Sequence, residues 1–186
     1  MILLTTGVPG STKTLNNIKR LCEDSLYTHI QLEKDLPKQK RKIYYYNVKG
    51  VTHDWIELTE DQAKKWYELP HGSVVFLDEC QELFRPQRHD AVQPRTWTEL
   101  EKHRHLGIDI ILGTQHPSLI DTKICRQVGR HIHYERKFGM DSVQSLTWEK
   151  CVNNPDDYFA RTEAIKKRVK LDSKYFGTYK SAEVHT

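Results

Sequence analysis

The chain has 186 residues, which is the length of one domain with a substantial core, and its 37% hydrophobic and 29% charged residues exclude an intrinsically disordered chain. The net charge of +4, from 29 basic and 25 acidic residues, is too small to argue by itself for a nucleic-acid-binding protein. No stretch approaches the roughly 20 apolar residues of a membrane span.

The first predicted strand, residues 2–6, leads into a glycine-containing turn and a predicted helix over about 13–24. The turn reads Gly7, Val8, Pro9, Gly10, Ser11, Thr12, Lys13, Thr14. This order predicts a phosphate-binding loop for ATP: backbone N–H groups wrap the phosphates, Lys13 reaches the outer ones, and Thr14 ligates Mg²⁺. The alternative is an ordinary Gly/Pro turn between a strand and a helix.

One position departs from the pattern G-x-x-x-x-G-K-S/T, because Thr12 stands where the second glycine belongs. Glycine there lets the backbone approach phosphate and adopt φ values that a β-branched residue resists. We therefore expect Thr12 to weaken nucleotide binding while leaving the fold intact.

The next elements are a basic run at residues 38–42, a strand over 43–48, and a helix that begins after Thr59 with Gln62 closing a capping box. The basic run together with Tyr44, Tyr45 and Tyr46 is a candidate platform for single-stranded DNA. A solvated approach to a buried strand explains the same residues more simply.

A continuous apolar run at residues 74–77 ends in Asp78 and Glu79. A buried parallel strand has this pattern, and ligands of open α/β sheets bind beside the carboxyl ends of such strands. We expect Asp78 to hold Mg²⁺ and Glu79 to act as the general base that polarises the attacking water. The alternative is a core strand with a polar end.

We expect a mobile loop over residues 82–97 and a helix from 98 to about 105. Residues 107–113 predict another buried strand, which ends in Thr114 and Gln115. Gln115 is the candidate for contact with the γ-phosphate or the attacking water, or else it caps the turn that follows. Arg104 and Arg85 are candidate arginine fingers for a neighbouring subunit, or else solvated surface residues.

A short helix over 118–126 and a strand over 130–135 complete the alternation of strands and helices. The alternation predicts an α/β fold, P-loop NTPase-like, with three α/β/α layers and a mostly parallel sheet over residues 1–160. Residues 161–186 form a basic tail with a predicted helix around 166–168, suited to lipid head groups or nucleic acid. The cysteines lack a C-x-x-C pair and predict reduced, cytosolic thiols: Cys22, Cys80, Cys125 and Cys151.

These motifs closely resemble the zonular occludens toxin family, which includes the gene I assembly proteins of filamentous phages. The resemblance spans residues 1 to about 183. It is carried by the phosphate loop and acid pair, and more specifically by residues 107–117 and by the Tyr-Phe-Gly-Thr-Tyr-Lys-Ser run at 175–181. The loop residues that match the family are Gly7, Pro9, Gly10, Ser11, Lys13 and Thr14, whereas Thr12 departs from the family glycine.

The resemblance implies an ATP-binding, Mg²⁺-dependent ATPase domain at the cytoplasmic face of the bacterial inner membrane. Family members have one transmembrane helix and a periplasmic part, so we expect this chain to be the soluble cytoplasmic domain alone, with residues 161–186 as a juxtamembrane segment and without toxin activity. The implied partners are ATP, further copies in an oligomer or ring, other phage assembly proteins, and single-stranded phage DNA. The alternative is a degenerate P-loop domain that serves as a non-catalytic assembly or interaction module.

Overall fold

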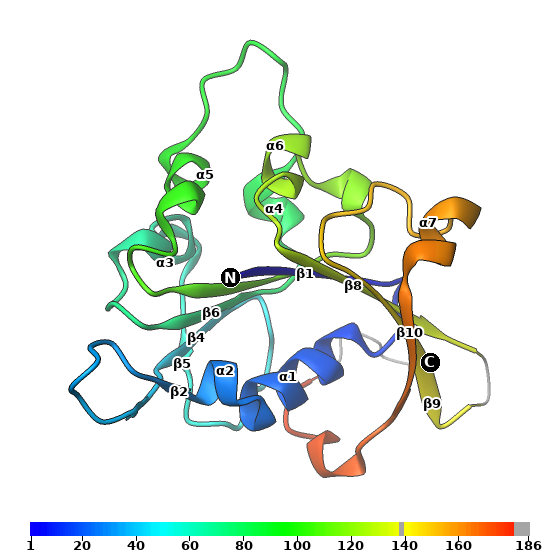
Figure 1. Cartoon of the computed structure of the whole chain (residues 1–186), viewed down its shortest axis with the longest axis horizontal. Coiled ribbons are helices and arrows are strands. Elements are labelled where there is room, and N and C mark those ends of the chain that lie inside the picture. Colours follow the sequence, from blue (N-terminus) through cyan, green and yellow to red (C-terminus); the bar gives the residue numbers. More distant parts are fainter. Residues whose placement is uncertain (138–139, 181–186) are drawn as a thin grey trace.

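A computed structural model of the chain describes residues 1–137 and 140–180 (Figure 1). Within these residues, eight strands form one sheet in the order β10-β9-β8-β1-β7-β6-β4-β5. Its strands are β1 (Ile2–Thr6), β4 (Ile43–Tyr46), β5 (Ile56–Glu57), β6 (Val74–Leu77), β7 (Asp109–Gly113), β8 (Arg130–Arg136), β9 (Ser142–Trp148) and β10 (Ile165–Lys170). A separate ribbon pairs β2 (His29–Ile30) with β3 (Gln39–Lys40).

The six strands from β5 to β8 run parallel, whereas β9 and β10 add an antiparallel extension at one edge. The strand β1 lies centrally between β7 and β8, so its carboxyl end opens into the middle of the sheet edge. The strand β6 is separated from β1 by β7 alone. This order places the ends of β1, β6 and β7 together, which is where ligands of open α/β sheets bind.

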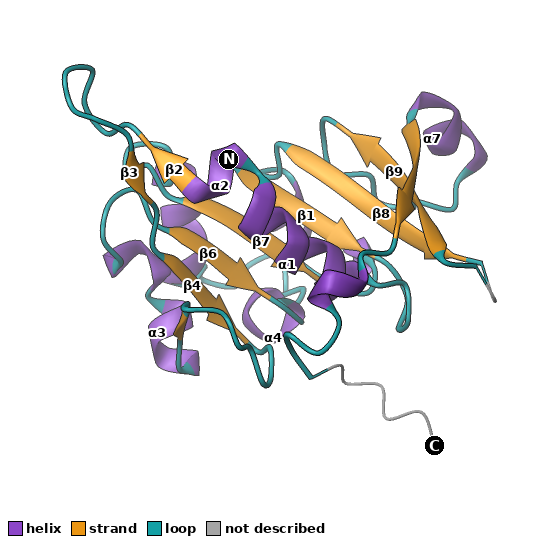
Figure 2. Cartoon of the chain, turned by 90° about the horizontal axis from the view of Figure 1, so that it is seen from below, coloured by secondary structure: helices purple, strands orange, loops and turns teal. Residues whose placement is uncertain are grey.

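Helices cover both faces of the sheet, so the predicted three-layer α/β/α arrangement is confirmed (Figures 1 and 2). One face carries α1 (Lys13–Glu23) and α2 (Ser25–Thr28). The other face carries α3 (Glu60–Lys64), α4 (Gln81–Phe84), α5 (Arg95–Thr98) and α6 (Thr122–Cys125), while α7 (Tyr158–Glu163) lies near β9 and β10. Short 3-10 turns complete the described elements at Trp66–Glu68, Glu99–Lys102, Pro117–Leu119 and Ser173–Tyr175.

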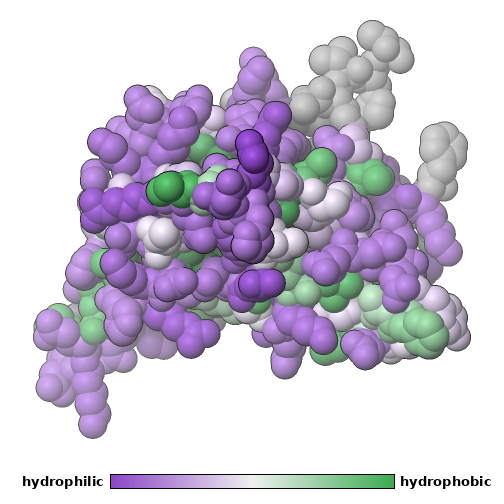
Figure 3. Space-filling view, turned by 90° about the horizontal axis from the view of Figure 1, so that it is seen from above, coloured by the Kyte–Doolittle hydropathy of each residue, from purple (hydrophilic) through white to green (hydrophobic). Residues whose placement is uncertain are grey.

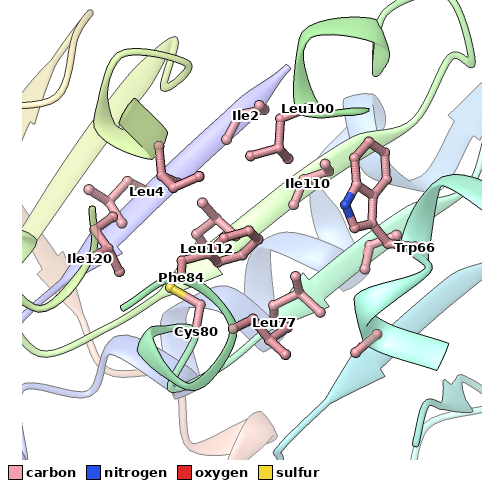
Figure 4. Packing of buried hydrophobic residues seen from close by; sticks show 14 of the residues in the cluster. Ile2, Leu4, Trp66, Leu77, Cys80, Phe84, Leu100, Ile110, Leu112 and Ile120 are labelled. Carbon is pink, nitrogen blue, oxygen red and sulfur yellow. The ribbon is translucent and has the colours of Figure 1, made fainter. Parts of the chain in front are cut away.

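Three apolar clusters of described residues hold these layers together, and the two largest lie on opposite faces of the sheet. Figure 4 shows the larger one, in which Phe84 of α4 and Trp66 pack over the strands β1, β6 and β7. The second cluster joins the opposite face of the strands to α1 through Leu21 and to α2 through Tyr27. Because both faces of β6 are covered, Val74–Leu77 is buried throughout, as its continuous apolar sequence predicts.

On the face shown in Figure 3 the surface is mainly hydrophilic, and the apolar side chains lie in small separate areas. In residues 1–137 and 140–180, the helices are all too short or too polar to cross a bilayer.

The predicted strands over residues 2–6 and 74–77 are confirmed, as is the capping box of α3. In that box Thr59 accepts from the N–H of Gln62, and the Gln62 side chain accepts from the N–H of Thr59. The helix predicted over 98–105 is wrong: α5 begins at Arg95, and a 3-10 turn follows it. Residues 82–97 are accordingly not one loop, because parts of α4 and α5 lie within them.

The helix predicted around residues 166–168 is also wrong, because these residues lie in β10. All six residues of β10 pair with β9, from Ile165 opposite Thr147 to Lys170 opposite Ser142. Lysine and arginine favour helices in isolation, but ladder pairing along a whole strand overrides that preference. Tyr175 is buried as well, so much of the basic tail packs on the domain. Ser181 and Glu183 lie outside the described residues, and the juxtamembrane role of residues 161–186 stays a prediction.

Candidate functional site

The turn after β1 is a tight loop whose packing requires glycine at its first position. A Cβ built on Gly7 would lie 2.3 Å from the Ser11 hydroxyl oxygen and 2.7 Å from the main-chain oxygen of Tyr134, so only glycine fits there. Its N–H donates to the carbonyl of Gln115 at 3.1 Å, which joins the loop to the end of β7. The Ser11 hydroxyl is buried and has no hydrogen-bond partner within the described part of the chain. An unsatisfied buried hydroxyl inside a glycine-lined loop suits a bound anion.

Thr12 adopts the left-handed conformation that the missing glycine would favour, with φ of 65° and ψ of 20°. Local hydrogen bonds hold it there. Its hydroxyl donates to the carbonyl of Ser11 at 2.6 Å, and the Asn16 side-chain amide donates to the Thr12 carbonyl at 2.9 Å and hydroxyl at 3.0 Å. The threonine is therefore accommodated in the backbone geometry of the loop, and Asn16, which the sequence reading missed, is what anchors it.

Lys13 is buried against the acid pair. Its ammonium lies 3.2 Å from Asp78 Oδ1 and 3.5 Å from Glu79 Oε1, and only 7% of its side chain is exposed. The Thr14 hydroxyl donates to Asp78 Oδ2 at 2.7 Å. The two motifs that the sequence separates are therefore in direct contact, and the two oxygens expected to hold Mg²⁺ are hydrogen-bonded to each other.

The last residue of β7 makes room for the aspartate. A Cβ on Gly113 would lie 2.4 Å from Asp78 Oδ1, so a larger residue there would displace the carboxylate. The neighbouring thiol of Cys80 is fully buried, and this burial raises its pKa, which makes it an unreactive core residue.

Glu79 lies at the edge of this buried group, in a strained main-chain conformation with φ of 47°. Its carboxylate accepts a hydrogen bond from the Gln81 amide at 2.6 Å. Gln81 in turn accepts one from the Thr114 hydroxyl at 2.9 Å. Sequence reasoning missed both partners. The position of Thr114 at the end of a buried strand beside the acid strand was the available signal.

Gln115 stands apart from the acid pair. Its main-chain oxygen contacts the loop through Gly7, but its side chain is exposed and makes no hydrogen bond to the described residues. It lines a pocket of about 460 Å³ together with Val8 and residues of β8. Its contact with phosphate or water stays a prediction.

The two candidate arginine fingers lie at opposite ends of the parallel strands. Arg104 precedes β7, whose five residues at about 3.3 Å each carry the chain toward the phosphate loop. It is therefore on the order of 15 Å or more from its own loop and could serve only the loop of another copy. Arg85 follows α4 and lies at the same edge as Glu79. Both roles stay predictions.

A hydrogen-bonded chain of histidines supports the end of β1. The N–H of Val152 donates to His131 Nδ1 at 3.2 Å, so the single proton of the neutral ring lies on Nε2 and is donated to the Thr6 hydroxyl at 2.7 Å. Thr6 then donates to His133 Nδ1 at 2.8 Å. Burial, with a smaller effect of His133, lowers the pKa of His131 to about 3. This neutral network fixes the residue that immediately precedes the loop.

Three potential metal ligands lie close together near the end of β8. Atoms of His133, Glu135 and Asp156 that could coordinate a metal ion lie within 4.8 Å of one another. Arg161 already supplies the positive charge for these carboxylates, since its guanidinium pairs with both oxygens of Glu135 and lies 3.8 Å from Asp156. The Arg161 hydrogen bond holds the pKa of Glu135 below its ordinary value. The group is thus satisfied as an ion pair that ties α7 to β8.

The model of the Zonular occludens toxin (Zot) family matches residues 1–186. This chain belongs to that family. Among curated proteins it is 31% identical over 193 residues to ORF301 of Pseudomonas phage Pf3, whose name describes an assembly protein. The match covers 100% of this chain but 60% of that protein, so the chain spans well under the full length of its relative.

Solved structures agree with the assignment. The N-terminal domain of zonular occludens toxin from Neisseria meningitidis superposes with a TM-score of 0.77 at 26% identity, covering 96% of this chain and 98% of that one. The genome packaging NTPase B204 from Sulfolobus turreted icosahedral virus 2, in complex with AMPPCP, superposes with a TM-score of 0.58 at 14% identity, covering 92% and 97%. At that identity the likeness shows the fold alone, and it confirms the predicted P-loop NTPase fold. The chain is therefore a Zot-family domain with a P-loop NTPase-like α/β fold.

Proposed function

We propose that this domain binds ATP with Mg²⁺ and hydrolyses it to drive virion assembly and export. The observation that carries the proposal is the convergence of Lys13, Thr14, Asp78 and Glu79 from two distant segments, with distances of 2.7–3.5 Å between partners. The unsatisfied hydroxyl of Ser11 inside the loop supports an anionic ligand. The nucleotide-bound state of the B204 structures supports ATP as that ligand by analogy of fold.

Each residue then has a definite task. Lys13 exchanges its contacts with the acid pair for the outer phosphates, because its ammonium is a cation of the loop sequence itself. Thr14 and Asp78 offer the hard oxygen ligands that Mg²⁺ prefers, and the bound ion would offset phosphate charge. Glu79 accepts a proton from the attacking water, whose oxygen forms a bond to the γ-phosphorus. The bond between the γ-phosphorus and the bridging oxygen breaks, and ADP and phosphate leave.

The competing proposal is a degenerate, non-catalytic assembly module, and Thr12 is the observation that favours it. A Cβ in the left-handed region costs on the order of 1–3 kcal/mol, and its branched side chain borders the phosphate cradle. The intact contacts among Lys13, Asp78 and Glu79 favour the enzyme, since Lys13 and Asp78 are buried together at a desolvation cost that a mere scaffold does not need.

A basic face supports single-stranded nucleic acid as a further partner. The register of β10 puts Lys166, Arg168 and Lys170 on the same side of the sheet, and among the described residues none of the three forms an ion pair. Two of them line a hollow of about 300 Å³ with Lys137 and Gln144. Glu135, the acid in that hollow, is neutralised by Arg161. A recessed cationic surface with hydrogen-bond donors fits a phosphate backbone.

Membrane anchoring, an oligomer or ring, and contacts with other assembly proteins complete the proposal for the whole protein. They rest on family membership and on the name of the Pf3 relative, of which this chain spans 60%.

The enzymatic proposal is tested by phosphate release from Mg²⁺-ATP, measured on the native chain and on Glu79→Gln. The expected result is turnover by the native chain and retention of unhydrolysed ATP by the variant, since the amide cannot accept the proton. Binding of ATP by the native chain without turnover would leave the non-catalytic module. Equal turnover by both proteins would remove Glu79 from its role.

A further inference from the structure

We propose that Gln81 is the residue that positions the Glu79 carboxylate, and that Thr114 at the tip of β7 sets the orientation of Gln81. The inference rests on the proposed function, because it concerns the general base of that reaction. Nothing in the phosphate-loop pattern or the acid pair assigns a role to either residue.

The donor and the acceptor in both side-chain hydrogen bonds of Gln81 follow from the chemistry of its partners. A carboxylate only accepts, so the 2.6 Å contact with Glu79 Oε2 requires the Gln81 amide nitrogen as donor. The Gln81 carbonyl oxygen then faces Thr114, and at 2.9 Å the hydroxyl must donate to it. A flipped amide would place two acceptors against each other at Glu79. The buried Thr114 hydroxyl thus selects the one amide orientation that supports the base.

A main-chain hydrogen bond fixes the positions of Glu79, Gln81 and Thr114 relative to one another. The N–H of Cys80, which separates Glu79 from Gln81, donates to the carbonyl of Gly113 at 2.8 Å. The start of α4 is therefore fastened to the end of β7 by its backbone as well as by the side chains of Gln81 and Thr114. A displacement of the tip of β7 would move Gln81 and, through it, the carboxylate.

The second contact of the base is with Lys13, at 3.5 Å from Glu79 Oε1, which is longer than an ordinary hydrogen bond. In the proposed reaction Lys13 turns to the outer phosphates, and the Gln81 amide is then the side-chain donor that remains on the carboxylate. With 35% of its side chain exposed and φ of 47°, Glu79 has little else to fix its direction. Gln81 therefore affects the rate of the chemical step more than the binding of nucleotide.

Thr114→Val is the sharpest variant, because it keeps the shape of the side chain and removes the donated hydrogen bond. Thr114→Ser is its matched control, since it keeps the hydroxyl. We expect Thr114→Val and Gln81→Leu to lower kcat by about tenfold, while the dissociation constant for Mg²⁺-ATP changes by less than about twofold. The serine variant should recover most of kcat relative to valine.

A second readout does not depend on turnover. The readout is the NMR signal of the Gln81 side-chain amide, which is assigned because it disappears in Gln81→Leu. In the native chain one proton of this amide should be shifted strongly downfield by its hydrogen bond to the carboxylate. Thr114→Val should remove that shift and Thr114→Ser should keep it. An unaltered amide signal in Thr114→Val would overturn the inference, whether or not the native chain hydrolyses ATP. Equal losses of kcat from valine and serine would also overturn it, whereas a native chain with the amide signature but without turnover would refute only the proposed function.

Discussion

The hydroxyl of Thr14 donates to Asp78 Oδ2 at 2.7 Å across 64 residues of sequence. This contact joins the first turn of α1 to the end of β6, and the ammonium of Lys13 lies beside it, 3.2 Å from the other oxygen of the same carboxylate. Asp78 is thus shared between the two residues expected to bind phosphate and metal. Four properties of the domain can be tested by substitution.

The first concerns stability. Lys13→Met removes the cation from a pair whose side chains are only 7% and 8% exposed, and leaves Asp78 buried without it. We expect the free energy of unfolding, measured by urea denaturation, to fall by about 3 kcal/mol. The matched control is the double variant Lys13→Met, Asp78→Asn, which removes both charges and should recover part of the loss. A double variant no more stable than Lys13→Met would show that the pair is not coupled.

The second concerns the loop residue that departs from the family. Thr12→Gly removes a Cβ from a position with φ of 65°, and should raise the affinity for Mg²⁺-ATP by about tenfold, which corresponds to about 1.4 kcal/mol of relieved strain. Thr12→Ala keeps the Cβ at the same φ and should show no such gain. Equal affinities for the glycine variant and the native chain, measured by fluorescent-nucleotide titration, would mean that Asn16 holds the loop in a fully competent form.

Pattern reasoning located the site better than it located the sheet edge. Strands such as Val74–Leu77 are buried on both faces, so their continuous apolar sequence marks them directly. The extension by β9 and β10 lies at an edge of the sheet. Buried and half-buried residues are mixed along β9, and β10 has no buried residue, so neither strand has a continuous apolar sequence. The lysines of β10 favour a helix in isolation and lead to the wrong prediction.

The role of Gln81 could not be predicted from the sequence, because its side-chain hydrogen bond to Thr114, across 33 residues, leaves no periodic signal. The acid pair, Asp78 and Glu79, could be predicted from the sequence, because its position at the end of a buried strand is itself the signal.

The third prediction concerns pH. The folded-state pKa of His131 is lowered to about 3, below the ordinary value of 6.5, so the unfolded chain binds the proton more readily. Stability is therefore fully present above about pH 6.5 and is lost as the pH falls toward 3. His131→Gln does not titrate and should reduce the slope of unfolding free energy against pH in this window. The control His71→Gln, at an exposed position, should leave the slope as it is. An unchanged slope in His131→Gln would contradict the assignment of a neutral, buried ring.

The fourth prediction concerns the basic face. The double variant Lys166→Ala, Arg168→Ala should weaken binding of a single-stranded oligonucleotide and reduce the slope of log affinity against log salt by about 1.4, from the loss of two phosphate contacts. Lys65→Ala, an exposed lysine next to α3 at the far end of the sheet, is the control and should have no effect. If anionic vesicles bind through the same residues while the oligonucleotide does not bind, the face serves a membrane instead.

The central claim is that the loop after β1 is a working nucleotide site. The most direct test is calorimetric titration of Mg²⁺-ATP into the native chain and into Lys13→Met, each first shown to be folded by circular dichroism. The account predicts saturable binding by the native chain and none by the variant. Absence of binding by the folded native chain, or equal binding by both proteins, would contradict it.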